Sequence, residues 1–144
     1  MLTPEIWTML YKITLSAGLG MVIGAERETR DKPAGLRTHA LVAIGSTIFT
    51  ILSFVNFFEG VGYSFDPSRI AAQVVVGIGF LGGGIIFMRG GEAQGITTAA
   101  GIWITAAIGM AVGFGLYVVA IYSALISVFI LWAFRRVESK LHQK

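Results

Sequence analysis

Long runs of apolar residues, separated by short polar segments, dominate the 144 residues of this chain. A membrane-spanning helix needs roughly 17–25 mostly apolar residues. The last apolar block, residues 96–134, is too long for one span, because a helix rises about 1.5 Å per residue and a hydrocarbon core is about 30 Å thick. Gly113-Phe114-Gly115 is the expected turn within it. The pattern therefore predicts five spans, at residues 6–25, 40–58, 70–88, 96–113 and 116–134.

The predicted fold class is an all-α membrane helix bundle, with residues 1–144 as one transmembrane domain. Only helices and closed β-barrels satisfy their backbone in lipid, and the apolar runs lack the alternation of barrel strands. The composition agrees, since 55% of residues are hydrophobic and 13% are charged, whereas soluble domains carry about 25% charged residues. The first span is expected to remain as a signal anchor, because Glu26-Arg27-Glu28 stands where small residues would mark cleavage.

Basic residues gather on one side of the predicted membrane. The first loop, the third loop and the C-terminal tail hold nine of them, whereas Arg69 lies on the other side. The positive-inside rule therefore predicts an external N-terminus and a cytoplasmic C-terminus. Lys12 lies inside the first span and is expected to extend its ammonium outward. The nine basic residues are Arg27, Arg30, Lys32, Arg37, Arg89, Arg135, Arg136, Lys140 and Lys144.

Pairs of glycines four residues apart recur in the predicted spans. Such spacing lets two helices approach closely in lipid, so these glycines are expected to pack against other helices. An alternative is that Gly82-Gly83-Gly84 forms a broken helix that lines a cavity, as in transporters. The predicted packing positions are Gly20, Gly24, Gly79, Gly82, Gly83, Gly109 and Gly113.

Two predicted helices begin on the cytoplasmic side, one at Gly35-Leu36-Arg37-Thr38 and the other at Gly95-Ile96-Thr97-Thr98. The threonine hydroxyls are expected to cap the free N–H groups of these helices. Helix N-termini carry partial positive charge, so an anion or an acidic partner could bind there; alternatively, these groups only cap helices. Glu26, at the end of the first span, needs a basic partner, and Arg37 or Arg89 is the expected one. The predicted functional cluster comprises Glu26, Arg27, Arg37, Thr38, Arg89, Thr97 and Thr98.

Four carboxylates are weak candidates for a hard cation such as magnesium, which takes one or two carboxylates and several waters. Their spacing is not diagnostic, and pairing with neighbouring Lys and Arg is the alternative explanation. These residues are Glu26, Glu28, Asp31 and Glu92.

Several other functions lack support in the sequence. The chain has no cysteine, and its two histidines, His39 and His142, are expected to be interfacial or solvated. Catalytic motifs are absent, so neither an enzyme nor a cofactor is expected. Nucleic-acid binding is not expected either, because the basic residues are few and dispersed.

Four motifs resemble, in the same order, the signature blocks of the MgtC/SapB family of membrane proteins. The resemblance covers roughly residues 15–120, with small departures at Gly83, where alanine is common, and at Ile96, where leucine is common. The motifs are Gly24-Ala25-Glu26-Arg27-Glu28, Lys32-Pro33-Ala34-Gly35-Leu36-Arg37-Thr38-His39, Gly77-Ile78-Gly79-Phe80-Leu81-Gly82-Gly83-Gly84 and Gly95-Ile96-Thr97-Thr98-Ala99-Ala100.

The resemblance implies a bacterial inner-membrane protein linked to adaptation to low magnesium and, in pathogens, to survival inside macrophages. MgtC itself is regarded as not transporting magnesium and is proposed to restrain the proton-driven ATP synthase and to affect phosphate uptake. Longer family members continue into a soluble cytoplasmic domain, whereas this chain stops at Lys144.

Three hypotheses follow from the sequence. The first is a non-enzymatic regulator that binds a membrane protein such as the ATP synthase. The others are a small cation channel or carrier and a lipid or anion sensor. Membrane lipids and further copies of the chain, in a homo-oligomer, are the other expected partners.

Overall fold

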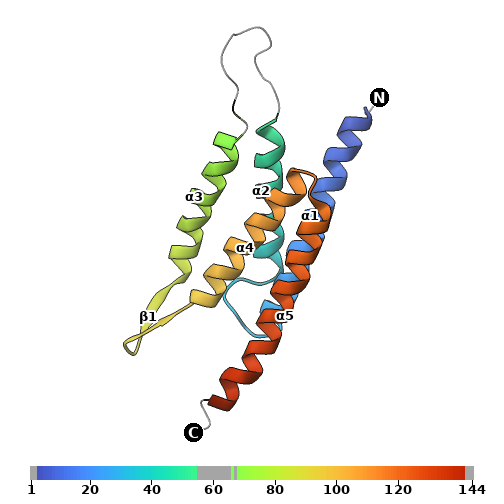
Figure 1. The fold of residues 1–144 in the computed structure, drawn as a ribbon. Coiled ribbons are helices and arrows are strands. Elements are labelled where there is room, and N and C mark those ends of the chain that lie inside the picture. The colour runs from blue at the N-terminus through green and yellow to red at the C-terminus, as the bar shows by residue number, and fades with distance from the viewer. Residues whose placement is uncertain (1–2, 55–65, 67, 142–144) are drawn as a thin grey trace.

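The computed structural model describes residues 3–54, 66 and 68–141, and within this part the chain forms five helices and one short hairpin (Figure 1). This confirms the predicted all-helical bundle. The end of the second predicted span, residues 55–58, and His142 lie outside the described residues. The elements are α1 (Pro4–Glu28), α2 (Leu36–Leu52), α3 (Ser68–Ile85), β1 (Phe87–Arg89), β2 (Glu92–Gln94), α4 (Ile96–Gly113) and α5 (Tyr117–Leu141).

The helices differ in length. Three are long and apolar enough to cross a membrane, namely α1, α4 and the Tyr117–Phe134 part of α5. The apolar helices in α2 and at Ala71–Ile85 of α3 are shorter. The orientation of the bundle in the membrane stays a prediction from the basic residues.

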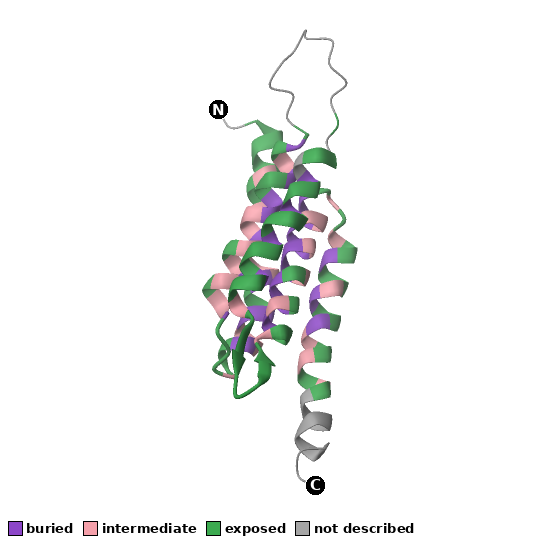
Figure 2. Cartoon of the chain, turned by 90° about the vertical axis from the view of Figure 1, so that its left-hand side faces the viewer, coloured by how far each residue is buried: buried purple, intermediate pink, exposed green. Residues whose placement is uncertain are grey.

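The α4 helix is the centre of the bundle, because it contacts each of the other four helices. Half of its 18 residues are buried, and the buried positions of all helices gather along the interior where they meet (Figure 2). The apolar core lies on both sides of α4. One cluster includes Ile23, Ile108 and Val112, and the other includes Ile102 and Ile78.

Four of the predicted packing glycines lie where two helices touch. A Cβ atom added at Gly20 would lie 2.5 Å from the His39 carbonyl oxygen, and one added at Gly24 would lie 2.7 Å from the Cα of Leu36. Likewise, a Cβ at Gly109 would collide with the Ala43 carbonyl oxygen. The fourth is Gly113, where a Cβ would lie 2.5 Å from the Thr50 Cβ. The absence of a side chain therefore brings α2 against both α1 and α4.

The glycines of α3 are placed differently. A Cβ at Gly82 would make ordinary contact with Ala99 at 3.6 Å, whereas one at Gly79 or Gly83 would meet nothing within 4 Å in the described structure. Among the described residues, the expected packing of Gly79 and Gly83 against another helix is therefore not present. The alternative of a broken helix is not seen either, because α3 continues through Gly82-Gly83-Gly84 to Ile85.

The segment between α3 and α4 was not predicted correctly. The third span was expected to reach residue 88, but α3 ends at Ile85 and the chain turns back as the antiparallel hairpin β1–β2. Gly90 and Gly91 form the turn at φ 63° and 86°, a left-handed region that favours glycine. Helical continuation through this turn is excluded by these backbone angles, although the apolar residues before it fit a span.

Candidate functional site

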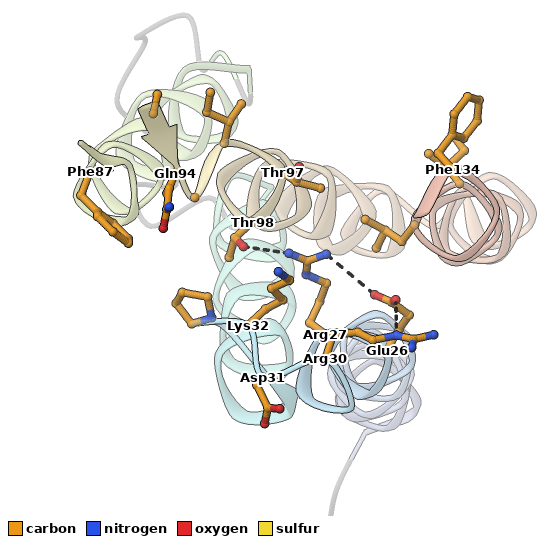
Figure 3. Close-up of a pocket in the computed structure, with 16 residues that line it drawn as sticks. Glu26, Arg27, Arg30, Asp31, Lys32, Phe87, Gln94, Thr97, Thr98 and Phe134 are labelled. Carbon is orange, nitrogen blue, oxygen red and sulfur yellow. Dashed lines mark hydrogen bonds and ion pairs between the residues drawn. The ribbon is translucent and has the colours of Figure 1, made fainter. Parts of the chain in front are cut away.

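A cavity of about 1060 Å³ opens at the end of the bundle where α1 ends and α4 begins (Figure 3). The loop after α1, the β1–β2 hairpin and part of α5 complete its wall. We call this end the hairpin end. The lining residues are Glu26, Arg27, Arg30, Asp31, Lys32, Pro33, Phe87, Ala93, Gln94, Gly95, Ile96, Thr97, Thr98, Ile130, Leu131 and Phe134.

The Arg27 side chain links α1 to α4 inside this cavity wall. Its side chain is only 6% exposed. The Nη2 group donates a hydrogen bond to Thr98 Oγ1 at 2.8 Å, and Nη1 lies 3.9 Å from the Glu26 carboxylate. A buried guanidinium with both an anion and a hydroxyl acceptor is the arrangement that makes such burial tolerable. Residues 71 positions apart in the sequence are thereby joined.

The Glu26 carboxylate lies between Arg27 of its own helix and Arg30 in the turn that follows it. Its side chain is 9% exposed, and Arg30 Nε donates to Oε1 at 3.4 Å, one helical turn away. The predicted pairing with Arg37 or Arg89 is therefore wrong. The physical reason is that α1 remains helical to Glu28, which brings residue 30 close to residue 26 before any other loop can reach it.

In the Glu26–Arg27 pair, two buried polar atoms have no hydrogen-bond partner in the described structure: Glu26 Oε2 and Arg27 Nε. Buried polar groups are normally satisfied, so each exception calls for an explanation. Both atoms belong to residues that line the cavity, but the atoms themselves are buried behind its surface.

The threonine caps predicted for the two cavity-side helices are wrong. Glycines occupy both N-cap positions, and no side chain caps either helix from there. Gly95 has a left-handed φ of 90°, and a Cβ there would collide with the Ile85 carbonyl oxygen. The α2 N-terminus instead receives the Glu28 carboxylate, which accepts a hydrogen bond from the Leu36 N–H at 2.7 Å. The α4 N-terminus faces the cavity, where Thr97 and Thr98 are lining residues.

The structure brings together only part of the predicted cluster. Glu26, Arg27, Thr97 and Thr98 line one cavity, whereas Arg37, Thr38 and Arg89 do not. Both of these arginines are exposed, and the described part of the chain gives them no ion pair.

The candidate metal ligands are separated in the same way. Glu28 bonds the start of α2, Asp31 is exposed at a left-handed φ of 52°, and Glu92 lies in β2. Among the described residues, no group of three or more His, Asp or Glu could hold a metal ion.

Sequence reasoning missed a buried polar layer between α2 and α4. His39 was expected to be interfacial or solvated, but it is fully buried, with Nδ1 2.7 Å from Thr105 Oγ1. The Thr105 hydroxyl donates its hydrogen to the Gly101 carbonyl at 2.8 Å, so His39 Nδ1 must be the donor and Nε2 the bare acceptor. Nε2 is buried without a partner. Thr98 and Thr105 are seven residues apart and thus on one helix face, which is the signal that could have indicated this layer.

Lys12 lies within α1, and the structure gives its ammonium a partner that the sequence did not indicate. Its Nζ donates to the Gly113 carbonyl at 2.7 Å, so the ammonium is held at the C-terminus of α4. A cation there is favourable, because the carbonyls of the last turn lack intrahelical partners and carry partial negative charge.

The motifs that form the cavity wall, residues 24–28 and 95–100, lie within the region in which this chain is similar to known proteins. The model of the MgtC family matches residues 13–140. This chain belongs to the MgtC family. The match begins at residue 13, within α1, and ends at residue 140 of α5, so every residue that lines the cavity lies in the family domain.

Relatives in the MgtC family are longer than this chain. It is 44% identical over 146 residues to an Escherichia coli K12 protein named "Putative magnesium transporter YhiD", covering 99% of the chain and 66% of the relative. Protein MgtC of Salmonella typhimurium LT2 is 44% identical over 108 residues, covering 75% of the chain and 44% of that protein. The Synechocystis protein slr0014 is 41% identical over 116 residues, covering 81% and 47%. The chain thus spans two thirds or less of these relatives. No solved structure matches it.

Proposed function

We propose that this MgtC-family protein is a non-enzymatic regulator in the bacterial inner membrane that supports growth when magnesium is scarce. In a pathogen, the same role would support survival inside host cells. The protein acts by contacting a membrane protein through its hairpin end. The proton-driven ATP synthase is the partner that the family resemblance favours.

The β1–β2 hairpin is the observation that carries this proposal. Every residue of both strands is exposed, and Phe87 and Met88 expose 48% and 68% of their surface. The register pairs Met88 with Ala93 and Arg89 with Glu92. Apolar side chains exposed beside charged ones are typical of contact surfaces. A hairpin of fixed register presents such side chains without further ordering.

Complementation of a deletion strain under magnesium limitation tests this role. Met88→Glu places a charge on the exposed strand and contacts nothing in the core, so growth support and capture of the ATP synthase from native membranes should both be lost. Arg69→Gln is the matched control, because Arg69 is 85% exposed at the opposite end of α3. If Met88→Glu supports growth as well as wild type at equal protein levels, the hairpin is not the contact surface.

A cation carrier is the second candidate function. Two observations favour it: the buried polar layer between α2 and α4, and the 44% identity to the relative named "Putative magnesium transporter YhiD". Magnesium flux into liposomes containing the purified protein separates the two functions. A magnesium flux that exceeds the flux into empty liposomes and is reduced in Thr105→Val would favour the carrier. The regulator function requires no magnesium flux.

A further inference from the structure

We propose that the cavity at the hairpin end binds an anionic phospholipid, with the lipid phosphate at Arg30, Lys32 and the α4 N-terminus. This inference does not rest on the regulatory function proposed above, since it concerns a lipid and not a protein partner. Its test measures lipid retention and not growth. Failure of one proposal therefore leaves the other intact.

The charges of the cavity wall are complementary to a phosphate. Three basic side chains line it, and Glu26 is the carboxylate that lies among them. Asp31 also lines the cavity, but its carboxylate points away from the Arg27–Thr98 contact, whereas the Lys32 ammonium points toward it (Figure 3). Three basic side chains and two carboxylates leave one excess positive charge at this wall, and Lys32 is the basic side chain without an ion pair among the described residues. Basic pockets between transmembrane helices are typical sites for lipid head groups.

Unpartnered donors at the same wall provide a second, independent observation. The Arg27 side chain is 6% exposed, yet its Nε–H is buried without an acceptor. Beside it, the α4 N-terminus begins at a glycine cap with no side-chain acceptor for its first N–H groups. An anion bound in the cavity would accept from the first N–H groups of α4 and would lie beside the buried, incompletely paired Arg27 guanidinium.

The other half of the cavity is apolar, which is why the phosphate is assigned to a lipid. Ile130, Leu131 and Phe134 of α5 line it, together with Phe87 of the hairpin and Ile96 of α4. Free phosphate would gain nothing from this wall. A phospholipid joins an anionic head group to acyl chains, and so matches both halves of the lining.

Native mass spectrometry of the purified, delipidated full chain tests the proposal. Phosphatidylglycerol and phosphatidylethanolamine are titrated separately, and wild type should retain the anionic lipid in preference. Arg30→Gln/Lys32→Gln removes two basic charges and should weaken phosphatidylglycerol retention roughly 30-fold, and Lys32→Gln alone should weaken it about fivefold. Arg69→Gln removes one basic charge, as Lys32→Gln does, at the opposite end of α3, and this control should retain the lipid as wild type does.

Each result decides the proposal. Arg30 also pairs with Glu26, so if the double variant is less thermally stable than wild type, Lys32→Gln alone is decisive. Equal retention of the two lipids by wild type would overturn the assignment. So would undiminished phosphatidylglycerol retention in Lys32→Gln. A calorimetric titration in which inorganic phosphate binds while no lipid is preferred would overturn the lipid as the source of the phosphate.

Discussion

The glycines of α4 and of α3 have the same spacing in the sequence and opposite surroundings in the fold. Gly109 and Gly113 contact the backbone and side chains of α2 so closely that a Cβ atom at either position would collide with them. Gly79 and Gly83 face open space, and a groove of about 580 Å³ lies between α2 and α3. The α1–α2–α4 unit is therefore held by close backbone contact, whereas α3 lies on its outside.

A pair of glycines four residues apart therefore indicates that close helix packing is possible, but it does not indicate whether a neighbouring helix packs there. At α4 a neighbour occupies the space left by the missing side chain, and buried polar side chains lie beside the contact. At α3 the corresponding surface is available to a second copy of the chain. Four substitutions test this contrast, in order of decreasing expected effect on stability.

Glu26→Ala should cause the largest loss of stability. It leaves Arg27 buried with Thr98 as its one acceptor among the described residues, and removing one partner of a buried ion pair typically costs about 3–5 kcal/mol. The midpoint of thermal unfolding in detergent should fall, and growth support in low magnesium should be lost. Glu5→Ala, which removes an exposed carboxylate from the first turn of α1 and lies outside the hairpin, is the control. A Glu26→Ala protein as stable as wild type would show that the pair contributes nothing to the fold.

Gly109→Leu should destabilise the bundle by about 3 kcal/mol, at the upper end of overpacking costs. The Ala43 carbonyl oxygen lies where the new Cβ must go, and a backbone atom cannot rotate away as a side chain can. The yield of folded protein and its unfolding midpoint are the measurements. Retention of both at wild-type values would mean that α2 and α4 are farther apart than the structure places them.

Thr105→Val should cost about 1–3 kcal/mol, because the His39 Nδ1–H then loses its acceptor inside the bundle. Thr97→Val makes the same substitution at an exposed position, so it should change the free energy of unfolding very little. Chemical denaturation of both variants measures the difference. Equal stability of the two would indicate that His39 finds another acceptor.

Gly83→Leu should have the smallest effect on the single chain, within about 0.5 kcal/mol of wild type, as for exposed substitutions elsewhere. If α3 packs against a second copy of the chain, the same variant should lower the fraction of protein that forms a homo-oligomer, since a bulky side chain keeps two helices apart. Size-exclusion chromatography with light scattering reads out the oligomer. A large loss of thermal stability without any change in oligomer size would contradict the open position of Gly83.

Part of the cavity wall could be predicted from the sequence. Glu26, Arg27 and Thr98 were grouped because a carboxylate at the end of a span needs a cation and a helix start needs polar groups. The expectation of a long-range loop partner for Glu26 is wrong, because Arg30 stands only four residues later, in the turn directly after α1. Nothing in the apolar run before Gly90 indicated that it would end in a hairpin.

The sequence by itself determined that the chain forms a bundle of apolar helices, because lipid tolerates no unpaired backbone and the apolar runs have helical length. It also set which positions could pack closely, since only glycine lets backbones touch. Only the tertiary structure decided which glycines are used and that His39 is buried. Burial and pairing depend on which helix lies opposite, and α4 became central through contacts with every other helix that no local pattern records.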